Sequence, residues 1–186
     1  MPKILTPQFF NRTTTIVAQE LLGKFLVRRI GKKTTALMIT ETEAYDGFLD
    51  KASHAHRGQT PRNSIMFGEA GHIYAYFTYG MHWMLNIVTG PKNYPAAVLI
   101  RGGLKLGGAK FAQVKINGPG RVTKALQIDK RLNTLRASPE AGLWFEDRGV
   151  KVNPKDIKKT PRIGIRYAGV KWGNKKYRFV LKAGTA

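Results

Sequence analysis

The sequence predicts an α+β fold: a single domain over residues 1–186 with a curved, mainly antiparallel sheet, a protruding β-hairpin and peripheral helices. Segments with strand patterns outnumber those with helix patterns and follow one another directly, which favours antiparallel pairing. The chain is 42% apolar, which is ordinary for a globular protein and sufficient at this length for one buried core. It has no cysteine, which excludes a disulfide framework and a thiolate metal site.

The N-terminal part is predicted to contain one helix followed by two strands. Thr13–Leu22 is expected to form a short helix that ends at Gly23. Phe25–Arg29 and Thr34–Tyr45 are the predicted strands, and Gly31-Lys32-Lys33 is the turn between them.

A long loop and a second hairpin follow. Residues 46–63 are rich in Gly, Ser, His and Pro, and loops of this length are often functional. His72–Phe77 and Met81–Val88 are rich in aromatic and β-branched residues, which is typical of strands. Thr78-Tyr79-Gly80 is the expected hairpin tip between them.

One further strand and one further helix are predicted. Ala96–Arg101 is apolar until it ends in an arginine, which indicates a strand. The stretch NGPGRVTKALQI indicates a loop followed by a helix. Pro119 suits a first helical turn, and the apolar residues after it have helical spacing.

The charge balance points to a polyanionic partner. The chain has 32 Lys+Arg against 11 Asp+Glu, a formal net charge of +21. Nucleic acid is the commonest partner of such a protein, and an anionic membrane surface is a less common one. No apolar run approaches the ~18 residues of a membrane span, and the N-terminus lacks the apolar stretch of a secretory signal. We therefore expect an intracellular protein.

The scarce acidic residues are concentrated at the end of one predicted strand and in the loop after it. Four of the 11 are Glu41, Glu43, Asp46 and Asp50. Alternate side chains of a regular strand share a face, and the residues predicted to do so here are Leu37, Ile39, Glu41, Glu43 and Tyr45. A carboxylate on that face, beside a partly dry pocket, could act as general base on water. The alternative is a strand end that runs into solvent.

Two histidines follow the acids in the predicted loop. His54 and His56 are one residue apart, so a metal site is conceivable. Zinc sites usually have three or four ligands at clear spacings, and the zinc nucleobase deaminases need cysteines that this chain lacks. Ordinary loop histidines are the alternative that we favour over a metal site.

Aromatic residues are frequent in the second hairpin. Tyr74, Tyr76 and Trp83 suit either a core or a surface on which bases stack. Tyr79 at the expected tip is the best candidate for a side chain that wedges into a duplex. Asn117–Arg121 leads into a helix whose N-terminus could bind a phosphate, or it is a plain entry turn.

Longer motifs identify a family. ETEAY, RGQTPRN, MFGEAGHIYAYFTYGMHWMLNIV, AAVLIR, NGPGRVTKAL and TPRIGI resemble, in order and spacing, the alkyladenine (3-methyladenine) DNA glycosylase family, from about Phe9 to Phe179. The resemblance implies a single glycosylase domain of base-excision repair, located at DNA in the cytoplasm, nucleoid or nucleus. It implies a monomer that flips alkylated or deaminated purines out of double-stranded DNA and hydrolyses the N-glycosidic bond without cofactor or metal.

The resemblance also assigns roles to individual residues. Glu43 matches the general base that deprotonates the attacking water, and Arg101 matches the arginine that positions this water. After Arg101 the family usually continues with an acidic Glu-Pro element, whereas residues 102–108 contain no acid here.

The remaining assignments concern the flipped base and the hole that it leaves. Tyr45 and His54 match residues that stack on one face of the base, and Tyr76 matches the ring on its other face. Asn86 matches the side chain that crowds the 2-amino group of guanine. Tyr79 matches the tyrosine that fills the gap in the base stack from the minor groove.

A different class of protein would also account for part of the sequence. A non-catalytic nucleic-acid binder, such as an RNA- or ribosome-associated basic protein, explains the charge and the aromatic residues. It doesn't explain the clustered acids, because carboxylates that face a polyanion only weaken its binding. Hydrolysis, in contrast, requires such a group.

Overall fold

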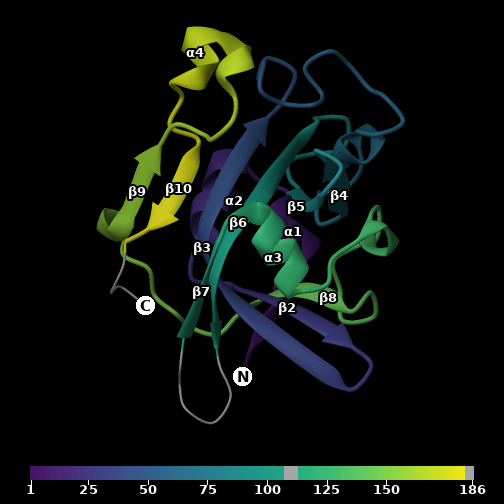
Figure 1. Ribbon diagram of the computed structural model, residues 1–186, viewed down its shortest axis with the longest axis vertical. Coiled ribbons are helices and arrows are strands. Elements are labelled where there is room, and N and C mark those ends of the chain that lie inside the picture. Colours follow the sequence, from purple (N-terminus) through teal and green to yellow (C-terminus); the bar gives the residue numbers. More distant parts are fainter. Residues whose placement is uncertain (107–112, 183–186) are drawn as a thin grey trace.

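The computed structural model describes residues 1–106 and 113–182, which are built around one ten-stranded sheet (Figure 1). The strands are β1 (Lys3–Ile4), β2 (Phe25–Ile30), β3 (Lys33–Asp46), β4 (Ile73–Thr78), β5 (His82–Val88), β6 (Ala96–Leu106), β7 (Gln113–Asn117), β8 (Leu143–Asp147), β9 (Ile157–Thr160) and β10 (Arg178–Leu181). The α-helices are α1 (Pro7–Phe10), α2 (Thr14–Glu20), α3 (Pro119–Ala125) and α4 (Gly169–Gly173). The 3₁₀ turns are η1 (Ser64–Phe67), η2 (Lys130–Leu132), η3 (Pro154–Asp156) and η4 (Arg166–Ala168).

The sheet is antiparallel at every pairing between these strands. Its main order is β1-β8-β2-β3-β6-β5-β4, while β7 pairs with β6 and the β9–β10 pair joins β3. The predicted fold class, a mainly antiparallel sheet with short helices, is confirmed. Within the described residues, no helix is both long and apolar enough to cross a membrane.

The main hydrophobic core lies where α2 and α3 pack against the central strands. Val17 of α2 and Val122 of α3 are fully buried with Ile39, Ile87 and Ile100 of the sheet. Each large apolar side chain that is buried in this way contributes about 1.5–3 kcal/mol. The core therefore fixes β3, β5 and β6, the three strands that carry most of the polar site described below.

The locally predicted elements of the first half are present. The first predicted helix is α2, and Gly23 follows it with φ +80°, a conformation that suits glycine. The first turn is tighter than predicted, because Ile30 pairs with Lys33 and leaves only Gly31-Lys32 between the strands. Residues 47–63 form the predicted long loop, with no helix or strand.

Strand β3 departs from regular alternation. Its register against β6 shifts on both sides of Glu41. Ile39 and Ala44 both belong to the main core, although a regular strand would place them on opposite faces. Glu43 and Tyr45 are hydrogen-bonded to each other on the other face. The prediction that the apolar start of this strand shares a face with its carboxylates is therefore wrong, because a β-bulge inverts the alternation.

Several strands were not predicted. β8 lies beside β2, far from its neighbours in sequence, and β9–β10 brings the C-terminal segment against β3 (Figure 1). The predicted strand at Ala96–Arg101 continues to Leu106, and β7, for which no prediction was made, leads into the turn before α3. Residues 107 and 108, the end of the glycine-rich departure after Arg101, lie outside the described residues.

Candidate functional site

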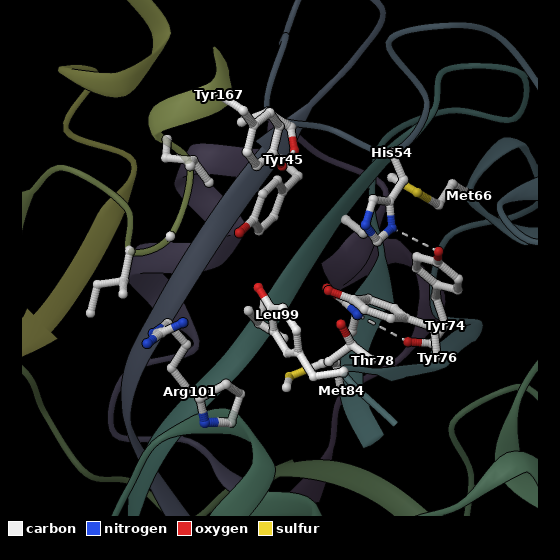
Figure 2. A pocket seen from close by; sticks show the side chains of 18 residues that line it. Tyr45, His54, Met66, Tyr74, Tyr76, Thr78, Met84, Leu99, Arg101 and Tyr167 are labelled. Carbon is white, nitrogen blue, oxygen red and sulfur yellow. Dashed lines mark hydrogen bonds between the residues drawn. The ribbon is translucent and has the colours of Figure 1, made fainter. Parts of the chain in front are cut away.

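A pocket of about 260 Å³ opens at one end of the sheet. Its lining comes from β3, the 46–63 loop, η1, the β4–β5 hairpin, β6, the first residue of α3 and the segment around η4 (Figure 2). Pockets for drug-sized ligands begin at about 300 Å³, so this volume suits one small group. Six of the seven predicted site residues line it, and they are Tyr45, His54, Tyr76, Tyr79, Asn86 and Arg101.

The seventh, Glu43, lies behind this lining. Its side chain has 0% of its surface exposed. Its Oε1 accepts a hydrogen bond of 2.8 Å from the backbone N–H of Ile163, and its Oε2 accepts one of 3.0 Å from the Tyr45 hydroxyl. Arg101 Nη1 lies 3.5 Å from the same Oε2. A carboxylate has about four lone-pair sites, so these three donors leave one for a water molecule.

The environment of Glu43 makes it a better base than an ordinary glutamate. Burial raises its pKa, while the charge of Arg101 and the hydrogen bonds from Ile163 and Tyr45 lower the pKa by less. Burial also raises the pKa of the Tyr45 hydroxyl well above its ordinary value, so Tyr45 stays protonated and donates a hydrogen bond to Glu43. A buried carboxylate with raised pKa beside a pocket is a typical catalytic arrangement.

Arg101 connects two carboxylates at the floor of the site. Its Nε donates to Glu41 Oε1 at 3.0 Å, in addition to the longer contact with Glu43. Arg178 of β10 donates to the same Glu41 oxygen at 2.6 Å. The backbone of Arg101 is fixed too, because its carbonyl accepts from Gly118 N–H at 2.9 Å.

Aromatic residues form the walls of the pocket. In Figure 2, Tyr45 and Tyr167 stand on one side, and His54, Tyr74 and Tyr76 on the other. The His54 and Tyr76 rings contact each other edge to face, with centroids 4.7 Å apart. His54 thus lies on the side of Tyr76 in this structure, rather than beside Tyr45 as the resemblance implied.

Hydrogen bonds hold the polar side chains of the wall. His54 Nδ1 lies 2.9 Å from the Tyr74 hydroxyl, and Asn86 Nδ2 donates to the Tyr74 carbonyl at 3.1 Å. Burial, with a smaller contribution from the charge of Arg62, lowers the pKa of His54. A neutral imidazole and a fixed amide are suited to read the edge of an uncharged or cationic base.

A buried ion pair behind Tyr45 was missed from the sequence. Arg162 donates through both terminal nitrogens to Asp50, and neither side chain has exposed surface. The Arg162 guanidinium lies 4.7 Å from the centre of the Tyr45 ring, and its Nη1 also donates to the Ala44 carbonyl at 2.8 Å. The pair therefore fixes the Tyr45 wall and places Ile163 beside Glu43. The only sequence signal was the arginine of TPRIGI.

Tyr79 occupies the tip of the β4–β5 hairpin at the pocket mouth. It is 82% exposed and has φ +53°. Its aromatic ring is therefore presented to solvent at the edge of a pocket whose walls already contain several aromatic rings. Figure 1 shows α4 at the same end of the molecule as the 46–63 loop.

The predicted phosphate site at the start of α3 receives little support. The helix has seven residues and begins with Pro119, which has no N–H to donate. The N–H groups of Gly118, Arg121 and Val122 donate to backbone carbonyls. The segment acts as an entry turn that supports Arg101.

The two loop histidines have separate partners. His54 contacts Tyr74, and His56 Nδ1 lies 2.9 Å from the Phe48 carbonyl. Among residues 1–106 and 113–182, no three His, Asp or Glu side chains come together as a metal site would require.

The chain is similar to known proteins over most of its length. A family model described as "Methylpurine-DNA glycosylase (MPG)" matches residues 8–185. A Methanocella arvoryzae protein is 44% identical over 176 residues, which cover 89% of this chain and 86% of that protein. One from Streptomyces avermitilis is 41% identical over 172 residues (87% and 81%), and one from Legionella pneumophila strain Paris is 40% identical over 182 residues (98% and 96%). All three carry the name "Putative 3-methyladenine DNA glycosylase".

Proposed function

The chain belongs to the methylpurine-DNA glycosylase family, and from that premise we propose that it excises damaged purines from duplex DNA with a water molecule activated by Glu43. As a member of this family it is a hydrolase that acts on N-glycosyl bonds of DNA. The observation that carries the proposed mechanism is the buried Glu43 carboxylate, held at the pocket floor by Arg101, Tyr45 and Ile163.

Binding to DNA begins with charge. The net charge of +21 attracts the phosphate backbone and releases counterions, without any information about sequence. The exposed ring of Tyr79 then enters the minor groove and replaces a nucleotide that leaves the stack. Extrusion costs a few kcal/mol, and less for a damaged, weakly paired base. Part of the selectivity for lesions therefore arises before the base reaches the pocket.

The extruded purine fills the space between the aromatic walls. Tyr45 covers one face, and Tyr76 with His54 borders the other. Asn86, which is buried and hydrogen-bonded to the Tyr74 carbonyl, cannot turn away, so it excludes the 2-amino group of an undamaged guanine. Alkylated and deaminated adenines lack this group and can be accommodated.

Glu43 supplies the base for hydrolysis. With its pKa raised by burial, it accepts a proton from water as that water attacks C1′ of the deoxyribose and the bond to the purine breaks. The carboxylate also offsets positive charge that develops on the sugar, and Arg101 holds the water. Of the described residues that line the pocket, none is a lysine, which is in keeping with hydrolysis rather than a Schiff-base mechanism. We propose that residues 1–186 act in this way as one monomeric domain.

The test is single-turnover excision on duplex oligonucleotides that carry one hypoxanthine, one 1,N6-ethenoadenine or one 3-methyladenine. Wild type should release at least one of these bases, and Glu43→Gln should lose excision by about 10²–10⁴-fold while its affinity for DNA changes little. Residual activity within tenfold of wild type would refute Glu43 as the base. Tight binding without excision of any lesion by wild type would indicate an inactive member of the family.

A further inference from the structure

Glu41 has no part in the mechanism above, yet it lies among the charged groups around Glu43. Arg101 Nε and Arg178 Nε both donate to Glu41 Oε1, at 3.0 and 2.6 Å. Arg101 approaches Glu43 with only one terminal nitrogen, at 3.5 Å. The stronger contacts of both arginines are therefore with Glu41 and not with the proposed base.

The bulge in β3 makes this arrangement possible. It places Glu41 opposite Gly102 of β6, where a Cβ atom would stand only 3.2 Å from the Cβ of Glu41. On the other side, Arg178 pairs in register with Glu43, so it could reach the base directly. Its side chain instead forms an ion pair with Glu41.

Without Glu41, Arg101 and Arg178 would be free to pair with the Glu43 carboxylate. Guanidinium groups pair with carboxylates through two parallel N–H···O bonds where geometry allows. Such a pair on Glu43 would consume the lone pair that a water needs. A closer cation would also stabilise the ionised form and make Glu43 a weaker base.

We propose that Glu41 is a positioning residue for the reaction: it anchors Arg101 through Nε and occupies Arg178, so that neither guanidinium closes on the Glu43 carboxylate. Arg101 then presents one terminal nitrogen to the site, where it can hold water. This inference rests on the proposed role of Glu43 as the base.

The charged, titratable and hydrogen-bonding groups around Glu43 come from every element packed against it. They are Glu41 and Tyr45 of β3, Tyr76 of β4, Arg101 of β6, Arg162 and Ile163 N–H before η4, Tyr167 of η4 and Arg178 of β10. Replacing Glu41 by glutamine removes one negative charge and releases two positive ones. All three changes favour the ionised form, so all lower the pKa of Glu43.

The experiment is the pH dependence of single-turnover excision by Glu41→Gln. The acid limb of the profile should move to lower pH by about one unit or more. The plateau rate should fall by up to about tenfold, because a weaker base transfers protons less effectively. Glu146→Gln on β8 is the matched control: Glu146 is a buried carboxylate paired with Arg148, and it does not line the pocket. Its acid limb should coincide with that of wild type.

A second variant protects the test against misfolding. Arg178→Met removes one of the two cations, while Arg101 stays paired with Glu41. The loss of a positive charge near Glu43 should raise its pKa, so the acid limb of this variant should move to higher pH. An acid limb that stays at the wild-type position in both variants would overturn the proposal, even if their rates fall or their melting temperatures drop. Appreciable excision by Glu43→Gln would instead refute the base itself, so the two failures can be told apart.

Discussion

Replacing Arg162 by methionine tests whether the buried ion pair anchors the site. The variant leaves the Asp50 carboxylate buried, with the backbone N–H groups of Asp46 and Ala52 as donors but without its cation. Removal of one partner of a buried pair costs about 3–5 kcal/mol. For a chain of this length, each kcal/mol lowers Tm by about 2–4 °C. We therefore expect Tm to fall by about 6–20 °C in a thermal melt followed by circular dichroism.

The control for this melt is Arg12→Met. Arg12 forms a pair with Glu20 at 2.7 Å in which both side chains are more than a third exposed, and exposed pairs contribute about 0–1 kcal/mol. Its Tm should stay within about 4 °C of wild type. If the Tm of Arg162→Met falls no further than that of Arg12→Met, the Arg162–Asp50 pair does not fix the Tyr45 wall and the reasoning is refuted.

Two further predictions concern the hairpin tip and the base. Tyr79→Ala should weaken binding to lesion-containing duplex more than binding to intact duplex, as measured by fluorescence anisotropy. The control, Ile30→Ala at the β2–β3 hairpin, should change neither affinity. Equal losses of affinity for both duplexes would argue against a role of Tyr79 as a wedge in the base stack. Glu43→Gln should melt at a higher temperature than wild type at pH 8, and this advantage should shrink at pH 4. The reason is that the raised pKa of Glu43 means that wild type loses stability as pH rises through that pKa. A lower Tm for the variant at pH 8 would contradict this.

Local patterns in the sequence were sufficient for the elements that carry most of the site. Strand periodicity and turn residues placed β3, the β4–β5 hairpin with Tyr79 at its tip, and the start of β6. These features depend on neighbours a few residues away, so they can be recognised without the fold. The choice of Glu43 over Glu41, and the role of Asn86, came only from the resemblance to the glycosylase family.

The sequence alone determined that this basic chain concentrates its acids beside aromatic residues, and it predicted a site for hydrolysis there. The tertiary structure decided where each acid lies and which groups it contacts. The register shifts on both sides of Glu41 invert the faces of β3, and such an irregularity cannot be recognised from the periodicity of the sequence. The partners of Glu43, Glu41 and Asp50 include Ile163, Arg178 and Arg162, each more than a hundred residues away in the chain. Such contacts arise only when β9–β10 docks on β3, because the energy of a buried charge depends on what surrounds it in space and not on its neighbours in sequence.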